Sequence, residues 1–472
     1  MLALGFQFLL LICAGTTGTV GVATAAPTPS PAAPVASKRS ALDLRQEDFR
    51  AVIARAKESI FPAVAYIRVV TEDAGGGRPR RRTASGSGVV VSDTGEVVTN
   101  WHVVEKAVEV RCLLNDGRAF HADIVGSDKD TDLALLRLRM KSGERVRAAK
   151  LAVSARPCEG DFVLALGAPW GLNRSVSFGI VSCARRYLAG TSEYNTWLQT
   201  DASISPGNSG GPLVDTNGHI IGINARGTTE GGTLAFAIPA ETVALVVPRL
   251  RKHKEANWAW TGLQLQPLRD FERDIYFEGD SGVIVAGTDA DSPARAAGAL
   301  PNDRLLRVGG KPVRALMEED LPAVRLRLAL LPQGKPVVLD ILRAGKPLRL
   351  TLTPRAKGGV EGAEAAFERW DFSAKAINKF ESPTLYFERR SGVYVSAIRY
   401  PGNASDSQLS QNDILLTVNG RPVATLADLR REHKAALDKF AQGGPRRVLL
   451  TVLRNGQRIQ VVLDFSRDYT LR

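Results

Sequence analysis

The chain has 472 residues, of which 44% are hydrophobic and only 6% aromatic, and it carries a formal net charge of +13. This length suffices for about three domains that each bury a core, so it predicts a soluble multidomain protein and excludes a single small domain. The positive charge is spread along the chain and no nucleic-acid-binding module accompanies it, which argues against DNA or RNA as a partner.

The amino-terminal segment has the composition of an export signal. The first 37 residues contain no charged side chain, and residues 2–22 are apolar before small residues follow. This pattern predicts a signal peptide over residues 1–25, cleaved after Ala25. An uncleaved membrane anchor is the alternative, because the usual positive charges are absent, although glycine and threonine at 15–19 favour cleavage. The segment 26–45, rich in proline and alanine, is predicted to be an extended linker.

Helical spacing of apolar residues predicts helices over residues 46–60 and 239–254. Between them, residues 61–238 consist of short apolar runs punctuated by glycine and asparagine, the pattern of antiparallel β-barrels. Residues 78–82 (RPRRR) form a basic cluster in this region. We interpret the cluster as a solvated loop, and contact with anionic lipid, polysaccharide or an acidic substrate is the alternative.

A glycine-rich segment carries the residue type of a nucleophile. Residues 206–212 (PGNSGGP) place Ser209 between glycines that can hold a tight turn and direct backbone N–H groups toward a ligand. A nucleophilic serine needs a base, and His102 is the best candidate of the five histidines because it follows a strand-like apolar run that ends in a turn. The other four histidines lie in ordinary strand, turn or charged helical sequence.

The base in turn needs a carboxylate that fixes its orientation, and three aspartates compete for that role. Asp132 alone directly precedes an apolar run, residues 133–136, so it is expected to be drawn into the interior. We interpret Asp128 and Asp130 as solvated turn residues. The resulting order along the chain, histidine then aspartate then serine, is that of the chymotrypsin-type double barrel.

Two further motifs flank these candidates, residues 85–91 (SGSGVVV) ahead of the histidine and residues 234–239 (LAFAIP) after the serine. With them, the chain resembles the HtrA/DegP family of trypsin-like serine proteases that carry PDZ domains, over most of residues 46–470. The resemblance implies a mainly β protein, in which a chymotrypsin-like double β-barrel over residues 46–255 precedes two α+β PDZ domains.

The same resemblance implies a role for each candidate residue. His102 would be the general base, Asp132 its orienting partner and Ser209 the nucleophile. The backbone N–H groups of Gly207 and Ser209, with Asn208 between them, would form the oxyanion hole that stabilises the transition state.

The resemblance further implies a homotrimer or higher oligomer, and a primary pocket for small aliphatic side chains that is lined in part by residues 225–234. Ser205 departs from the family, which usually has asparagine at this point, and the change would alter the wall of that pocket. No cofactor and no metal is expected. Once the leader is removed, the cysteines are Cys112, Cys158 and Cys183, which lack metal-ligand spacing. Cys112 and Cys183 lie in strand-like apolar sequence, so buried thiols are expected there, and a single disulfide is the alternative.

A duplicated module follows the protease region. Residues 281–285 and 302–313 recur as residues 391–395 and 412–423, at an offset of 110 residues (391 minus 281). This period is the size of a small domain. The two copies, residues 258–355 and 367–468, resemble circularly permuted PDZ domains, and residues 356–366 are expected to be a linker rich in glycine and alanine.

PDZ domains bind an extended peptide as an added strand and hold its terminal carboxylate in a nest of backbone N–H groups. In the first copy the expected peptide-binding residues are Gly262, Leu263, Gln264 and Leu265, and C-terminal peptides are the expected ligands. In the second copy, residues 370–373 (WDFS) lack glycine and introduce an aspartate that would repel a carboxylate, so a role in assembly is expected. The alternative for both copies is that they only brace the protease.

The sequence therefore predicts an ATP-independent serine endopeptidase of the periplasm or cell envelope, which degrades unfolded or damaged proteins and is regulated by peptide binding at the first PDZ domain. A rival from another class is a non-proteolytic chaperone or peptide-binding scaffold whose protease fold rests in an inactive conformation. Membrane contact through the leader or the basic cluster stays open.

A pH dependence follows from the role of the base. Because His102 must be neutral to accept the proton of Ser209, activity is expected to fall as the pH drops through about 6 to 7, where histidine side chains become charged. Hydrolysis rates measured across this range test the assignment, and a flat profile down to about pH 5 would contradict it.

Overall fold

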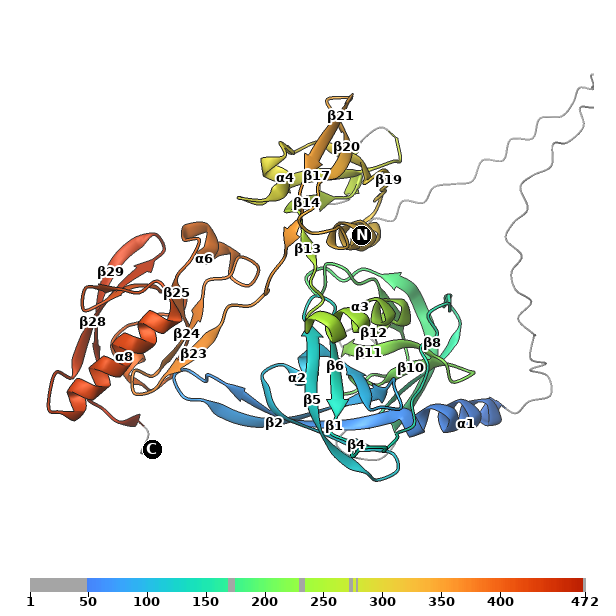
Figure 1. Ribbon diagram of the computed structural model, residues 1–472, viewed down its shortest axis with the longest axis horizontal. Coiled ribbons are helices and arrows are strands. Elements are labelled where there is room, and N and C mark those ends of the chain that lie inside the picture. Colours follow the sequence, from blue (N-terminus) through green and yellow to red (C-terminus); the bar gives the residue numbers. More distant parts are fainter. Residues whose placement is uncertain (1–48, 169–174, 229–233, 271–274, 277–278, 470–472) are drawn as a thin grey trace, which may run out of the picture. The chain divides into compact units, whose positions relative to one another are not determined.

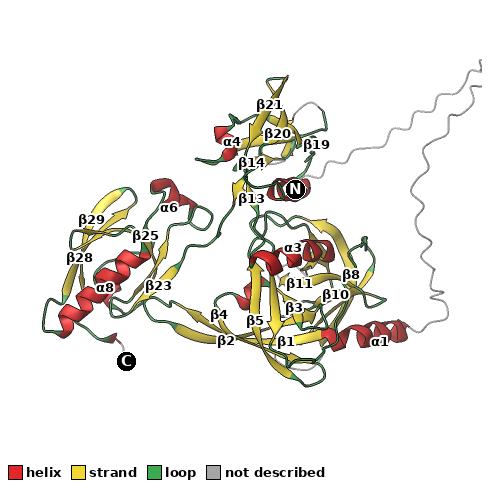
Figure 2. Cartoon of the chain, in the orientation of Figure 1, coloured by secondary structure: helices red, strands yellow, loops and turns green. Residues whose placement is uncertain are grey.

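The computed structural model describes residues 49–168, 175–228, 234–270, 275–276 and 279–469 (Figure 1). Strands account for most of the regular structure (Figure 2), and the predicted mainly β fold is confirmed. The expected signal peptide, residues 1–25, and the linker 26–45 lie outside the described residues.

Two closed six-stranded barrels form the first part of the fold, so the predicted double barrel is confirmed. The strand order is β1-β2-β3-β6-β5-β4 in the first barrel and β10-β11-β12-β9-β8-β7 in the second. The strands of the first barrel are β1 (Val64–Asp73), β2 (Arg80–Val90), β3 (Glu96–Thr99), β4 (Ala107–Leu114), β5 (Ala119–Asp128) and β6 (Leu133–Leu138). Those of the second are β7 (Phe162–Gly167), β8 (Ser175–Arg186), β9 (Trp197–Thr200), β10 (Pro212–Asp215), β11 (Ile220–Thr228) and β12 (Leu234–Pro239).

The pairing of β3 with β6 places the ends of two buried strands together. All four residues of β3 are buried, as are Leu133–Leu136 at the start of β6. The two strands are antiparallel, with Thr99 opposite Ala134. The residues that follow β3 and those that precede β6 therefore meet at the same end of the barrel.

Two amphipathic helices pack on the barrels. Helix α1 (Phe49–Ile60) buries Val52, Ala56 and Ile60, which lie on one face at four-residue spacing. Helix α3 (Ala240–His253) likewise buries one face, formed by Val243, Val246, Val247 and Leu250. Among the described residues, no helix has both the length and the apolar character required to cross a bilayer.

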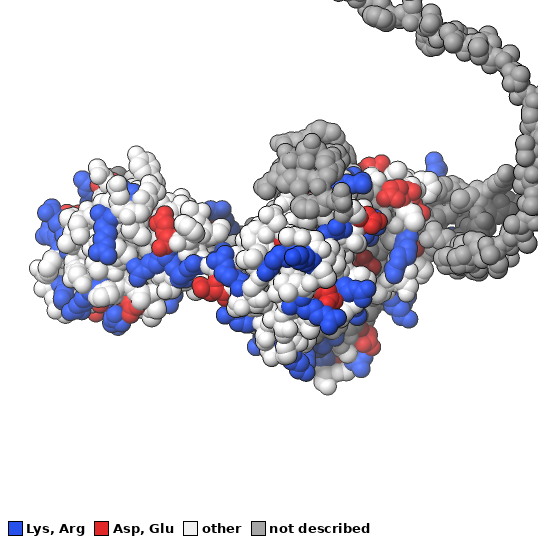
Figure 3. Space-filling view, turned by 90° about the horizontal axis from the view of Figure 1, so that it is seen from above, with Lys and Arg blue, Asp and Glu red and all other residues white. Residues whose placement is uncertain are grey.

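The basic cluster is wrongly interpreted as a loop, because Arg80, Arg81 and Arg82 belong to strand β2. These arginines lie opposite the acidic end of β1, and Arg81 Nε donates to Glu72 Oε2 at 2.8 Å. On the face drawn in Figure 3, Lys and Arg side chains are interspersed with acidic and uncharged residues rather than merged into one patch.

Two further sheets follow the barrels and are consistent with the predicted PDZ domains. We call residues 259–352 the first module and residues 364–464 the second module. The first module contains β14 (Leu263–Gln266), β17 (Val283–Thr288), β18 (Arg304–Val308), β19 (Lys311–Pro312), β20 (Val337–Arg343), β21 (Lys346–Leu352), α4 (Pro293–Ala296) and α5 (Leu321–Ala329). The second contains β23 (Glu364–Phe367), β24 (Phe372–Ala376), β25 (Val393–Ile398), β26 (Ile414–Val418), β27 (Arg421–Pro422), β28 (Arg447–Arg454), β29 (Gln457–Asp464), α6 (Pro383–Glu388), α7 (Asn403–Asp406) and α8 (Leu426–Ala441).

The short pair β13 (Ala259–Trp260) and β22 (Arg355–Ala356) joins the two ends of the first module. Because Ala356 lies in β22 and residues 364–366 lie in β23, only residues 357–363 of the expected linker are free of strand structure.

The repeat in the sequence encodes the same buried ion pair in both modules. Asp303 and Asp413 are 1% and 0% exposed. Arg343 contacts both carboxylate oxygens of Asp303 at 2.7 Å, and Arg454 contacts those of Asp413 at 2.6 and 2.7 Å. Each aspartate also accepts a backbone N–H from three residues earlier. A buried carboxylate is thus fully paired in each module, as its desolvation requires.

The modules differ at the strand that a peptide would extend. Strand β14 is the terminal strand of its sheet among the described residues, whereas β24 pairs with β25 on one side and with β23 on the other. The predicted repulsion by Asp371 is wrong, because this side chain is buried and accepts the backbone N–H of Asn403 at 3.0 Å. Strand β23 therefore occupies the edge of β24 to which a peptide would otherwise add.

The repeated ion pair yields a stability prediction. Asp303→Ala removes the buried carboxylate that accepts from Arg343 and from the Leu300 N–H, so we expect the first module to lose about 1–3 kcal/mol, chiefly through the N–H left without an acceptor. Hydrogen exchange of the β18 and β20 amides in the full chain measures this loss. Asp340→Ala is the matched control, because Asp340 is paired with Arg349 at the surface and should change the stability by about 0–1 kcal/mol. Equal protection in both variants would contradict the prediction.

Candidate active site

His102 lies on the short helix α2 (Trp101–Val104), directly after strand β3. Its Nδ1 is 2.9 Å from both carboxylate oxygens of Asp132. Its backbone N–H donates to Asp132 Oδ1 at 3.1 Å. The imidazole is 36% exposed, so one ring edge is held by the carboxylate while the ring remains accessible to a substrate.

Asp132 is 2% exposed and has a left-handed backbone with φ +57°. Aspartate tolerates this conformation better than most residues, because its short side chain hydrogen-bonds locally. The Asp132 carbonyl accepts the Trp101 N–H at 3.1 Å and Asn100 Nδ2 at 3.1 Å. Backbone and side chain of Asp132 together thus bind the turn that carries His102.

Ser209 belongs to the turn that precedes β10 and lies beside the His102 turn. An added Cβ at Gly86 would come within 2.8 Å of Val103 Cγ1 and 3.2 Å of the Ser209 carbonyl, so both turns approach the same point of β2. The Ser209 hydroxyl donates to the Ala225 carbonyl at 3.1 Å. Within the described residues no hydrogen bond joins it to His102, so the nucleophile candidate is close to the base but turned toward β11.

The glycine after Ser209 is required by packing. Gly210 has φ +85°, and a Cβ there would lie 2.1 Å from the Ser87 carbonyl. Ser87 in turn donates its backbone N–H to the Ser209 carbonyl at 2.8 Å. The turn that carries Ser209 therefore packs directly against strand β2, and a side chain at position 210 would force the turn and the strand apart.

The expected oxyanion donors are unoccupied. Gly207 has φ +103°, and its carbonyl accepts the Ser87 hydroxyl at 2.6 Å. Asn208, which is 2% exposed, donates its backbone N–H to the Ser205 carbonyl at 2.9 Å. Neither the Gly207 N–H nor the Ser209 N–H donates to another protein group in the part of the chain that the structure describes. Both N–H groups thus lack a protein acceptor among the described residues, as the expected role requires.

The expected pocket wall is described only in part, because residues 229–233 lie outside the described residues. Ala225 is buried, and Ser205, the position that departs from the family, is exposed.

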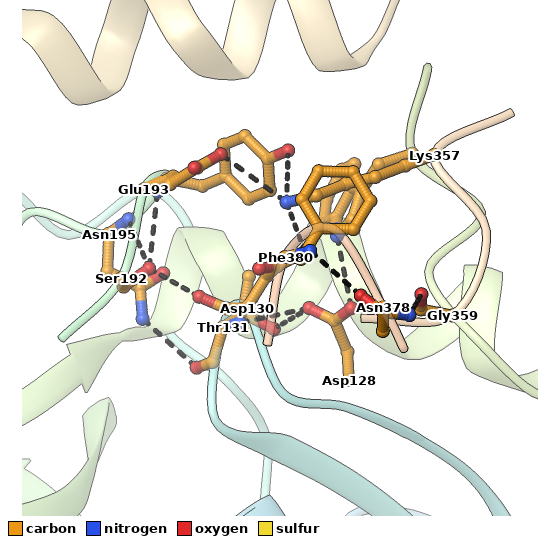
Figure 4. Close-up of polar contacts among 12 residues, drawn as sticks. Asp128, Asp130, Thr131, Ser192, Glu193, Asn195, Lys357, Gly359, Asn378 and Phe380 are labelled. Carbon is orange, nitrogen blue, oxygen red and sulfur yellow. Dashed lines mark hydrogen bonds and ion pairs between the residues drawn. The ribbon is translucent and has the colours of Figure 1, made fainter. Parts of the chain in front are cut away.

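The interpretation of Asp128 and Asp130 as solvated turn residues is wrong. Asp128 is 8% exposed, accepts Trp258 Nε1 at 3.0 Å and also binds the hydroxyl of Thr131. Burial, together with the nearby charge of Asp130, raises the pKa of Asp128 to about 6. The Asp130 side chain is 15% exposed and pairs with Lys357 (Figure 4). The loop before Asp132 is therefore anchored through both aspartates.

The three described cysteines are free thiols. Cys112 is buried, as expected, and burial raises its pKa to about 12. Cys158 is exposed and Cys183 is half-buried. Over the described ranges, the structure contains no group of side chains arranged to bind a metal ion.

The expected peptide-binding residues of the first module border an open cavity of about 1060 Å³. Gly262, Leu263, Gln264 and Leu265 line it from the β14 side and Leu328 from helix α5, and residues of the barrel region and of the second module, among them Tyr194 and Phe380, line its other sides. Gly262 has φ +73°, and a Cβ there would lie 2.1 Å from the Cβ of Ser292.

Comparison with known proteins gives consistent matches. The model of a trypsin-like peptidase domain matches residues 86–223. A probable periplasmic serine endoprotease DegP-like from Brucella suis is 31% identical over 396 residues, covering 82% of this chain and 75% of that protein. Its counterpart from Pseudomonas putida is 33% identical over 390 residues, covering 78% and 79%.

Among solved structures, the HtrA-type protease AlgW with tripeptide is similar with a TM-score of 0.57 and 31% identity, over 65% of this chain and 97% of that chain. The serine endoprotease from Yersinia pestis is similar with a TM-score of 0.50 and 28% identity, over 64% and 97%.

The geometry around His102 gives a direct test of the carboxylate. Asp132→Asn preserves the side-chain shape and tolerates the left-handed backbone, but it removes the charge that holds the Nδ1 proton and stabilises the imidazolium. We expect kcat for unfolded casein to fall about 10⁴-fold with the fold unchanged. A loss of less than about 10-fold in folded protein would argue against Asp132 as the partner of the base.

Proposed function

We propose that this chain, which belongs to the HtrA/DegP family of serine endoproteases, hydrolyses peptide bonds with Ser209 as nucleophile, His102 as base and Asp132 as orienting carboxylate. The observation that carries this assignment is the pair of 2.9 Å contacts between His102 Nδ1 and the buried Asp132 carboxylate. The chain is a serine endopeptidase, and these are the described groups able to supply its chemistry.

In the proposed reaction, Ser209 Oγ leaves the Ala225 carbonyl, rotates toward His102 Nε2 and attacks the scissile carbonyl. His102 takes the hydroxyl proton and delivers it to the leaving amine as the peptide C–N bond breaks, while Asp132 holds Nδ1–H and stabilises the imidazolium. Water, deprotonated by His102, then attacks the acyl group on Ser209 Oγ, which releases the carboxylic acid product and restores the serine hydroxyl. The free N–H groups of Gly207 and Ser209 receive the developing oxyanion. The described orientation of Ser209 is thus a resting one.

The proposed substrates are unfolded or damaged proteins in the periplasm or cell envelope, without a requirement for ATP. Relatives named periplasmic serine endoproteases support this location. An extended segment of an unfolded chain is the form of substrate that can reach a base and a nucleophile lying in turns at the barrel surface. We further propose a homotrimer or higher oligomer, on the family relationship.

The first module is proposed to act as a PDZ domain that binds the carboxyl terminus of a peptide. Strand β14 ends its sheet and borders the cavity with helix α5, so an added strand has backbone partners and room. In the second module β23 already occupies the corresponding edge of β24, which supports a role in contacts between parts of the assembly rather than in peptide capture.

Hydrolysis of unfolded casein by the full chain, beside Ser209→Ala, tests the proposal. We expect the Ser209→Ala variant to be inactive, because the remaining groups cannot form an acyl-enzyme. A fluorophosphonate probe should label the wild type at Ser209 and leave the variant unlabelled.

Each other result excludes a part of the proposal. Equal cleavage by both proteins would dismiss Ser209 as the nucleophile. Cleavage by neither protein, with aggregation of casein still suppressed, would favour the non-proteolytic chaperone over the endopeptidase.

A further inference from the structure

Lys357 lies outside the barrels, directly after β22, yet its ammonium group is buried against the protease region. The side chain is only 5% exposed. Its Nζ lies 2.8 Å from Asp130 Oδ2, 3.3 Å from Glu193 Oε2 and 3.2 Å from the Tyr194 hydroxyl. Figure 4 shows the lysine between the loop that carries Asp130 and the segment that carries Glu193.

The backbone of Lys357 is fixed at the base of the first module. Trp260 pairs with Arg355 between β13 and β22, and the Lys357 N–H donates to the Trp258 carbonyl at 2.8 Å. Trp258 is itself buried and binds Asp128. The β13–β22 pair and the hydrogen bond of the Lys357 N–H therefore fix the backbone from which the Lys357 side chain reaches the protease region.

The charges in this cluster depend on one another. Burial alone would lower the pKa of Lys357, but Tyr194, Glu193 and Asp130 together raise it above its ordinary value. Burial raises the pKa of Asp130, and Lys357 is the largest influence that opposes this rise. The ammonium is thus retained at neutral pH, and removal of Lys357 would leave the Asp130 carboxylate buried without its counter-ion.

The loop that Lys357 binds is the one that carries Asp132. The Asp130 carbonyl accepts the Ser192 hydroxyl, and the Thr131 carbonyl accepts Asn195 Nδ2 at 3.0 Å. These two hydrogen bonds hold the backbone of the loop. Lys357 instead binds a side chain of the loop: it makes the closest charged contact to Asp130, which lies two residues before Asp132. A shift of this loop would move Asp132 relative to His102, and a misplacement of about 1 Å can cost about 10²-fold in rate.

We propose that Lys357 is a positioning residue for the protease reaction: by binding Asp130 it holds the loop in the geometry in which Asp132 orients His102. The inference rests on the proposed roles of His102, Asp132 and Ser209. It makes a residue from outside the barrels part of the support of the site.

The experiment separates positioning from stability. Lys357→Met is compared with the double variant Lys357→Met/Asp130→Asn, in which no unpaired charge remains. The control is Lys375→Met, which removes the lysine of the Lys375–Glu381 pair in the second module, whose side chain is 16% exposed against 5% for Lys357. For each full-length protein we measure the melting temperature, kcat and KM for fluorescein-labelled casein, and the rate of fluorophosphonate labelling.

We expect Lys357→Met to lower both the melting temperature and kcat. The double variant should regain the melting temperature but keep a kcat and a labelling rate about 10-fold below wild type, with KM little changed. Lys375→Met should lose stability and keep its kcat.

A double variant that regains wild-type kcat together with its stability would overturn the proposal, because Lys357 would then only stabilise the fold. If the double variant does not fold, Lys357→Gln replaces it: kcat at least about threefold below wild type in folded protein supports the proposal, and an unchanged kcat overturns it. Activity retained by Ser209→Ala would instead remove the proposed nucleophile, a failure that these lysine variants do not produce.

Discussion

The antiparallel pairing of β3 with β6 is the constraint on which the rest of the site depends. Both strands are buried, and a slip of one residue would turn every side chain to the opposite face, so their register is strongly fixed. With Thr99 opposite Ala134, the turns after β3 and before β6 have no freedom to separate. The contact between His102 and Asp132 is therefore a consequence of how β3 and β6 pair in the barrel. Hydrogen bonds from Trp101 and Asn100 to the Asp132 carbonyl then set the fine geometry.

The three residues of the candidate site sit next to local signals in the sequence: a strand end, the start of an apolar run and a glycine-rich turn. The structure brings His102 and Asp132 into contact, and the catalytic roles stay predictions. The interpretation of the sequence failed for Asp128 and Asp130, whose surroundings are not local. Their partners Trp258 and Lys357 lie 130 and 227 residues further along the chain. A charged residue in a turn is solvated unless a distant donor covers it, and nothing near residue 130 indicates that a donor will. The arginines of β2 are exposed, as expected, and only their assignment to a loop was wrong, because they pair with the acidic end of the adjoining strand β1.

The two modules show the opposite case, in which similar sequence conceals a difference. The repeat correctly indicated two similar sheets, and the burial of Asp303 and Asp413 explains why an aspartate recurs at this point of the repeat. It could not indicate that β23 would pair with β24, because that pairing depends on a short segment ahead of the repeat. Phe367 of β23 stacks against Trp370 and Phe372 within the module core. Aromatic burial ahead of the repeat thus closes an edge that remains open in the first module.

The two halves of the candidate site consequently differ in how firmly they are held. His102 contacts the buried carboxylate of Asp132. The loop that carries Asp132 is anchored by Trp258 and Lys357. Among the residues that the structure describes, the Ser209 hydroxyl makes a single hydrogen bond, to the Ala225 carbonyl. Such a neutral bond contributes about 0.5–1.5 kcal/mol net, and rotation toward His102 would replace it with another of the same kind. The free-energy difference between the two orientations is then small compared with the binding energy of an extended substrate. For the proposed nucleophile, rotation toward His102 therefore exchanges one neutral hydrogen bond for another at little cost in free energy.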